Sequence, residues 1–129
     1  MTNKKLHLKL LKDTYGVCRL QKNDSIPSWA FEGEFYSITK TDDELSIVCL
    51  QNNIPENIKC ETDWKILKIQ GPLDFSLIGI LSKISTLMAE NEISIFAVST
   101  YDTDYILIKE EKIDIAINIL ENDIYEVKR

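Results

Sequence analysis

Two short stretches of the sequence carry groups that can bind a small charged molecule. The first surrounds Gly79, which the apolar pattern of residues 75–90 places in the first turns of a helix. Backbone amides at a helix start, together with the helix dipole, favour an anionic group such as a carboxylate. The second is the polar turn of residues 99–104, in which Asp104 can pair with an ammonium or guanidinium group. Together the two stretches would match the charges of a free amino acid.

Each stretch also has a structural explanation, which the sequence leaves open. A glycine inside a helix costs about 1 kcal/mol relative to alanine. Close packing of the helix on a sheet would explain Gly79 as well as an approaching ligand would. Ser, Thr and Asp favour turns because their side chains bond the backbone, which accounts for residues 99–104 without a ligand. The recurrence of Asp104 as Asp43, at an offset of 61, favours a functional role for Asp104.

The elements that would position these groups follow one another without a break. Residues 64–69 alternate apolar and polar side chains with a period of two, which predicts a half-buried strand. Gly71 and Pro72 end it, and leucine and isoleucine then recur at helical spacing through residues 75–90. The remaining elements predicted for this half are strands at 93–98 and 105–108, a helix at 112–121 and a strand at 124–127.

The first half of the chain repeats part of this pattern with little room for helices. Strands are predicted at 6–11, 17–20, 35–39 and 45–50, and residues 25–31 offer only a short helix. The polar turn between the last two strands matches the turn of residues 99–104, with Thr39 opposite Thr100 at the same offset of 61. We therefore predict two related α+β units, residues 1–62 and 63–129.

Composition excludes several classes of function. The 129 residues carry a net charge of −6, whereas phosphate-backbone binding needs clustered Lys and Arg, so no nucleic-acid partner is expected. No apolar run approaches the ~20 residues of a membrane-spanning helix. His7 and Lys9 interrupt the N-terminal apolar run, so it does not resemble a signal peptide. We expect a cytoplasmic protein that does not enter the membrane.

Catalytic and metal-binding patterns are not found in the sequence. Cys18, Cys49 and Cys60 contain no C-x-x-C pair, so no metal site is predicted and the thiols in strand patterns are expected to be buried. His7 alternates with leucines and is expected on the solvent side of a strand. There is no phosphate-binding loop, dinucleotide fingerprint or nucleophile elbow. We expect no enzymatic activity and no cofactor.

The chain resembles the ACT-domain family, in particular the small tandem-ACT proteins of bacteria that are similar to the arginine-sensing CASTOR proteins of animals. The resemblance rests on residues 71–75, 79–81, 93–96 and 99–105, and in the first half on 26–30, 33–39 and 42–48. It implies two ferredoxin-like βαββαβ units in tandem, with antiparallel sheets, helices on one face and side-by-side sheet pairing. It also implies a non-enzymatic regulatory role in which a small molecule, often an amino acid, binds at an interface between ACT units.

The same resemblance implies a set of ligand-binding residues and a homodimer. Carried over position by position, the site comprises Leu77, Ile78, Gly79, Ile80, Thr100, Tyr101 and Asp104. The arginine sensors carry an acidic residue at the position of Leu77, so an amino-acid-like ligand is implied but arginine itself is not. The animal sensors have four units, and a chain with two would dimerise to form comparable interfaces. The alternative is a ligand-free protein-interaction module that dimerises through its sheets.

Overall fold

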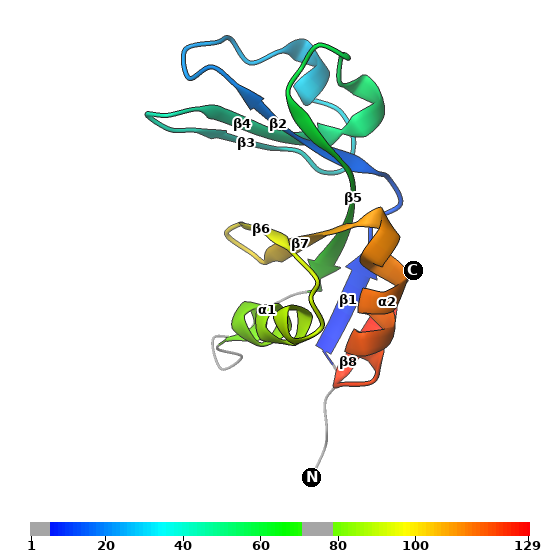
Figure 1. Ribbon diagram of the computed structural model, residues 1–129. Coiled ribbons are helices and arrows are strands. Elements are labelled where there is room, and N and C mark those ends of the chain that lie inside the picture. Colours follow the sequence, from blue (N-terminus) through cyan, green and yellow to red (C-terminus); the bar gives the residue numbers. More distant parts are fainter. Residues whose placement is uncertain (1–5, 71–78) are drawn as a thin grey trace. The chain divides into compact units, whose positions relative to one another are not determined.

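The computed structural model describes residues 6–70 and 79–129 (Figure 1). The chain divides into two compact units: Asp13–Trp64, called the inserted unit here, and Met1–Lys12 with Lys65–Arg129, called the host unit. The described elements are β1 (Leu6–Leu10), β2 (Tyr15–Leu20), η1 (Ser28–Ala30), β3 (Ser37–Lys40), β4 (Leu45–Leu50), η2 (Gln51–Asn53), β5 (Cys60–Ile69), α1 (Ile80–Glu90), β6 (Phe96–Ser99), β7 (Asp104–Lys109), α2 (Glu110–Glu121) and β8 (Tyr125–Lys128).

The host unit has the expected βαββαβ connectivity, with one strand added. Its elements follow the order β5, α1, β6, β7, α2 and β8, and its strands lie in the order β8-β1-β5-β7-β6. Strand β1 lies between β8 and β5, parallel to the first and antiparallel to the second. The predicted strand-turn-strand is confirmed, because Phe96 pairs with Leu107 and Ser99 with Asp104.

Both helices of the host unit contribute to one apolar core. Side chains alternate along a strand, so only every second residue of β1, β5, β7 and β8 reaches this core. Helix α1 contributes three buried residues and α2 contributes four. The core members are Leu8, Leu67, Ile69, Ile80, Ile84, Met88, Ile93, Ile106, Ile108, Ile113, Ala116, Ile117, Leu120, Tyr125 and Val127. The opposite face of β1 carries His7 and Lys9, as the alternation predicts.

The inserted unit follows the same connectivity with its helices reduced to single turns. Its order is β2, η1, β3, β4, η2 and the first part of β5, and its strands lie in the order β3-β4-β2-β5. The two helical positions are occupied by the three-residue 3-10 helices η1 and η2. Both helical positions of this unit are therefore much shorter than α1 and α2 of the host unit. A small core around Cys18, Ala30, Leu45, Ile47 and Cys49 lies on one face of its sheet.

Three sequence expectations need correction. The first 12 residues were expected in the first unit, but β1 pairs with β5 and β8 and so belongs to the host unit. The expected boundary between residues 62 and 63 lies inside β5. Gly79 was expected within the first helix, but α1 begins at Ile80 and Gly79 precedes it in a left-handed conformation with φ +83°. The expected start of that helix at residues 75–78 lies outside the described residues.

The register of the two hairpins also corrects the internal repeat. Lys40 faces Leu45 around the β3–β4 turn, and Ser99 faces Asp104 around the β6–β7 turn. The hairpins therefore correspond at an offset of 59 rather than 61, which pairs Thr41 with Thr100. The last four residues of β4 and β7 then share one burial pattern, three buried residues followed by one that is half-buried. At this offset Asp104 corresponds to Leu45, so the repeat gives Asp104 no counterpart at Asp43.

We predict that the face of α2 that enters the core dominates its contribution to stability. Ile117 is fully buried, whereas Ile115 on the same helix is 51% exposed. Ile117→Ala should lower the free energy of unfolding by about 2–5 kcal/mol, because it leaves a cavity in the core. The matched variant Ile115→Ala should change it by less than ~0.5 kcal/mol. Urea denaturation of both variants measures the difference, and equal losses would contradict this orientation of α2.

Candidate functional site

The turn between β6 and β7 is closed by the side chain of its first residue. The Thr100 amide donates to the Thr103 carbonyl at 2.8 Å, and the Thr100 hydroxyl donates to the same oxygen at 3.1 Å. The same hydroxyl oxygen accepts from the Thr103 amide at 3.3 Å. These bonds are those by which threonine stabilises a turn. Thr100 therefore has a structural role even though it was predicted as a ligand-binding residue.

Thr103 connects this turn to the end of strand β5. Its hydroxyl donates to the carbonyl of Ile69 at 2.6 Å, and the residue is only 6% exposed. Ile69 is the last residue of β5, so the chain leaves the sheet toward α1 from this point. The bond holds the β6–β7 turn beside the beginning of the connection to α1. Thr103 is the only polar residue that is buried among the described residues. No sequence pattern distinguished it from the other residues of the turn.

The start of α1 presents open backbone. Gly79 adopts a positive φ that disfavours other residues, and among the described residues no atom beyond its chain neighbours and its own helix backbone lies within 4 Å of the position that its Cβ would occupy. The helical ladder begins with the Lys83 amide, which donates to the Gly79 carbonyl at 2.8 Å. The first amides of the helix precede this ladder and have no intrahelical acceptor. Figure 1 shows the start of α1 and the β6–β7 turn on the same side of the host unit.

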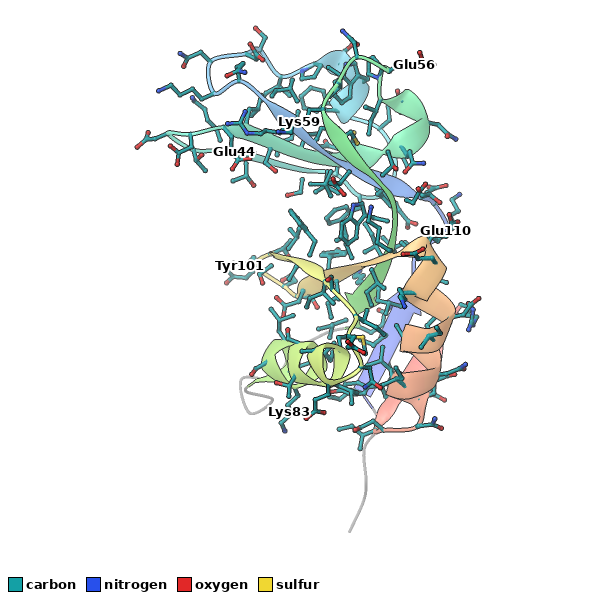
Figure 2. The ribbon with its side chains drawn as sticks, in the orientation of Figure 1. Glu44, Glu56, Lys59, Lys83, Tyr101 and Glu110 are labelled. Carbon is teal, nitrogen blue, oxygen red and sulfur yellow. The ribbon has the colours of Figure 1, made fainter. Side chains whose placement is uncertain are left out.

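The remaining predicted residues differ in what they can offer a ligand. The Ile80 side chain is 6% exposed and lies in the core, so it is not available to a ligand. Tyr101 is fully exposed at the tip of the turn (Figure 2). Leu77 and Ile78 lie outside the described residues. The structure thus places Thr100, Tyr101 and Asp104 on one turn and Gly79 at a helix start.

Asp104 already has a partner within the hairpin. It is the first residue of β7 and is half-buried, and one of its carboxylate oxygens accepts a hydrogen bond from the hydroxyl of Ser99. Ser99 is its register partner across the hairpin. The bond fixes the orientation of the carboxylate at the edge of the turn. An ionised carboxylate accepts several hydrogen bonds, so this one leaves capacity for a cation.

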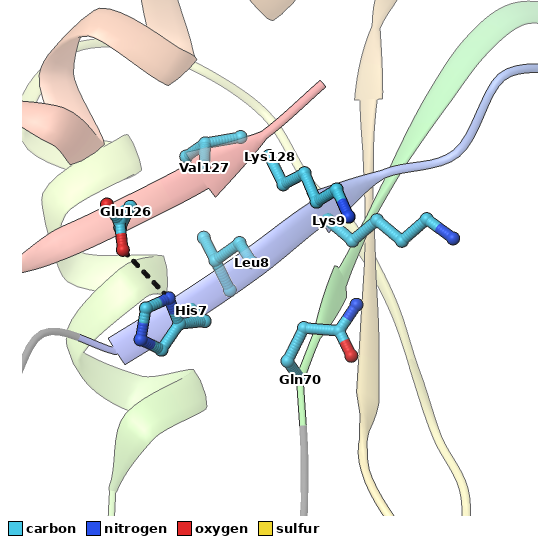
Figure 3. A pocket seen from close by; sticks show the side chains of 7 residues that line it. All are labelled: His7, Leu8, Lys9, Gln70, Glu126, Val127 and Lys128. Atoms are coloured by element: carbon cyan, nitrogen blue, oxygen red, sulfur yellow. Dashed lines mark ion pairs between the residues drawn. The ribbon is translucent and has the colours of Figure 1, made fainter.

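A separate depression lies on the sheet face opposite the helices. Its volume is about 720 Å³, and His7, Leu8, Lys9, Gln70, Glu126, Val127 and Lys128 line it (Figure 3). His7 Nδ1 lies 3.0 Å from Glu126 Oε2, but both side chains are more than half exposed, so the ion pair adds little stability. Sequence reasoning did not find this depression, because β1 and β8 lie at opposite ends of the chain.

The described residues give no further sign of a metal or membrane site. No group of three or more His, Cys, Asp or Glu side chains in them is arranged to hold a metal ion. No helix in residues 6–70 or 79–129 is long and apolar enough to cross a membrane.

We predict that the Thr103 hydroxyl, rather than its shape, anchors the turn. Thr103→Val keeps the volume but leaves the Ile69 carbonyl without its partner, which should cost about 1–3 kcal/mol of unfolding free energy. Thr103→Ser retains the hydroxyl and should lose less. Urea denaturation compares the two variants, and a valine variant as stable as the wild type would show that the bond does not anchor the turn.

Two families match the chain in separate segments. The ACT-domain family matches residues 59–122. A family of N-terminal domains matches residues 13–57, which lie within the inserted unit. The ACT-domain match begins at residue 59, six residues before the host unit resumes at Lys65.

Among characterised proteins, the chain is similar to the cytosolic arginine sensor for mTORC1 subunit 1. The protein of Bos taurus is 26% identical over 105 residues, which cover 71% of this chain and 32% of the sensor. The protein of Mus musculus is 28% identical over 95 residues, covering 67% of this chain and 29% of the sensor. The chain thus spans about a third of the length of these relatives.

Solved structures share the fold along nearly the whole chain. An Agrobacterium tumefaciens protein is 39% identical with a TM-score of 0.91, and the match covers 95% of this chain and 92% of that one. The regulatory subunit of aspartate kinase from Thermus thermophilus has a TM-score of 0.61 at 12% identity, covering 97% of this chain and all of that one. The family match shows that residues 59–122 of the chain belong to the ACT-domain family, and the solved structures share the fold of the chain as a whole.

Proposed function

We propose that the protein is a non-enzymatic regulatory module that binds a small amino-acid-like metabolite at one end of the host-unit sheet. The observation that carries this proposal is the bond from the Thr103 hydroxyl to the Ile69 carbonyl. It fixes the β6–β7 turn beside the point where the chain leaves β5 for α1. A carboxylate-bearing turn and a helix start can then act on one ligand.

The two sides of this site would recognise opposite charges. Open amides at the start of α1 and the positive end of the helix dipole favour the ligand's carboxylate. The Asp104 carboxylate, oriented by Ser99, favours its ammonium group. The positive φ of Gly79 and the lack of a side chain there allow a close approach to the backbone, and no side chain of the described residues lies within 4 Å of its Cβ position. These complementary charges support a zwitterionic ligand.

The relatives support the class of ligand rather than its identity. One is named an arginine sensor, and another is the regulatory subunit of an aspartate kinase. Leu77 provides no acidic partner for a long basic side chain. We therefore propose an amino acid or a close analogue and do not single out arginine. The three free thiols support a reducing compartment such as the cytoplasm as the place of action.

A ligand-free interaction module remains the alternative, and one contact favours it. Asp104 accepts a hydrogen bond from Ser99 within its own hairpin, so turn geometry alone can explain the residue. Under this alternative the protein would associate through its sheets without a small molecule.

We predict that Asp104 contributes to binding and that its neighbour Asp102 does not. A thermal-shift screen against the common amino acids should identify a ligand, since a ligand at 100 times its Kd stabilises the fold by about 2.7 kcal/mol. Calorimetry should then show Asp104→Asn binding weaker by about 1.5–3 kcal/mol, the loss expected for a charge-assisted hydrogen bond.

The matched control is Asp102→Asn, which changes an exposed carboxylate on the same turn. It should bind the ligand as the wild type does. Equal binding by all three proteins would make Asp104 structural. If no amino acid shifts the unfolding temperature, the ligand-free alternative holds.

We also predict that the protein forms a homodimer. Among the described strands of the host unit, β8 and β6 have a neighbour on one side only, and such edges can pair with a second copy. Sedimentation velocity at roughly tens of micromolar, a range in which weak interfaces assemble, should show a dimer. A monomer throughout that range would contradict the prediction.

A further inference from the structure

All three cysteines of the chain meet on one face of the inserted unit. They come from three adjacent strands: Cys18 from β2, Cys49 from β4 and Cys60 from β5. Cys18 and Cys60 face each other directly in the β2–β5 register. On the other side of β2, Cys49 faces Gly16, two residues before Cys18. Residues 18, 49 and 60 are far apart in sequence, and the sheet alone brings their thiols together.

The three side chains pack in one cluster. Cys18 and Cys49 are members of the small buried core, Cys60 packs against it, and Cys49 and Cys60 both raise the pKa of the Cys18 thiol. Gly16 leaves the room for this arrangement, because a Cβ there would lie 2.5 Å from Ile54 Cδ1 and 2.7 Å from Cys60 Sγ. A larger residue at this position would push the Cys60 sulfur out of its place. Glycine at this position of β2 thus leaves space for the side chains of both Ile54 and Cys60.

The backbone geometry suits a bond between Cys18 and Cys60. The Arg19 amide donates to the Lys59 carbonyl at 3.0 Å, so the neighbouring positions 18 and 60 form a non-hydrogen-bonded pair. In such pairs the Cα atoms are about 4.5 Å apart. Disulfides span Cα distances of about 4.4–6.8 Å. The two residues therefore need little backbone movement to be joined.

Access to solvent differs among the three thiols. Cys18 is 1% exposed and Cys49 is fully buried, whereas Cys60 is partly exposed and its thiol donates weakly to the Glu61 carbonyl at 3.4 Å. A dissolved oxidant can therefore reach Cys60 before it reaches the other two. Cys18 is buried and faces Cys60 in the β2–β5 register.

We propose that Cys60 is a site of reversible oxidation by peroxide. The oxidised Cys60 then forms a cross-strand disulfide with Cys18. The Cys60 sulfur attacks one peroxide oxygen; an S–O bond forms, the O–O bond breaks and water leaves, giving a sulfenic acid. The Cys18 sulfur then attacks the Cys60 sulfur. The S–O bond breaks, the S–S bond forms, and the Cys18 proton leaves with the hydroxyl group as a second water.

The surroundings of Cys60 make this a slow reaction at neutral pH. Burial raises the pKa of the Cys60 thiol, the hydrogen bond with Cys18 opposes the rise, and the neighbouring Cys49 and Glu61 add to it. Because the thiolate is the form that attacks peroxide, the rate should increase with pH between about pH 7 and pH 9. The site would respond to sustained rather than brief oxidation.

The disulfide would join the two strands through which the inserted unit connects to the host unit. Strand β2 follows β1 after a short turn, and β5 continues from Cys60 to Ile69. A bond between Cys18 and Cys60 would fix the pairing of these strands and resist its opening. It leaves Cys49 as a free thiol.

The test uses the intact protein, folded and treated with hydrogen peroxide. After denaturation, reactive thiols should fall from three to one and the mass should fall by two hydrogen atoms. Peptide mapping without reductant should link the peptides of Cys18 and Cys60, and dithiothreitol should restore all three thiols. The rate should rise with pH.

Three variants distinguish the roles of the cysteines. At the same peroxide dose, Cys60→Ser should keep both of its remaining thiols. Cys49→Ala should still form the disulfide between Cys18 and Cys60. In Cys18→Ala, the oxidation of Cys60 should stop at a sulfenic acid, which dimedone traps. If the folded protein keeps its three thiols at doses that oxidise the urea-unfolded chain, the proposal is wrong. A link through Cys49, or between two chains, would equally overturn it.

Discussion

Strand β1 is the constraint on which the host unit depends. Its register pairs Leu8 with Ile69 of β5 on one side and with Val127 of β8 on the other. The Gln70 amide extends this pairing by donating to the His7 carbonyl at 2.8 Å. The first described strand therefore fixes where β5 ends, and with it the Ile69 carbonyl to which Thr103 bonds. These contacts span most of the chain, and such non-local pairing is formed late and costs loop-closure entropy.

The hairpin turns of the two units share one hydrogen-bonding pattern but differ in what their last residue contacts. In both hairpins a threonine hydroxyl closes a four-residue turn, Thr41 in the first and Thr100 in the second. The fourth turn position is Glu44 in the inserted unit and Thr103 in the host unit. Only Thr103 is buried and bonded to a neighbouring strand. A single side chain thus turns a common hairpin into part of a candidate site.

The inserted unit differs from the host unit in its short helices and its small core. Its helices are reduced to η1 and η2, and residues from these turns and the following loops cover its small core. The space within that core is filled in part by thiols, with Gly16 giving room to Cys60. The fold tolerates such change because hydrophobic side chains of suitable size maintain a core. Proteins with 12% and 39% identity to this chain share its architecture for the same reason.

The sequence by itself determined the elements and their type, because periodicity records which face of each element is buried. It predicted the β6–β7 hairpin, a first unit with little helix and His7 on the solvent side of its strand. The residue types at Gly79 and in the β6–β7 turn also indicated candidate ligand-binding positions. Their use by a ligand is still a prediction.

Only the tertiary structure decided which strands are neighbours. The pattern of β1 reads the same in either unit, since alternation specifies a face and not a partner, and pairing with β5 and β8 placed it in the host unit. Register corrected the repeat from 61 to 59, because a shift of two residues preserves alternation and is invisible to it. The Thr103–Ile69 bond and the meeting of Cys18 with Cys60 likewise depend on register across strands. The local sequence determines which side chains lie on each face of a strand. Long-range pairing determines which residues of other strands they contact.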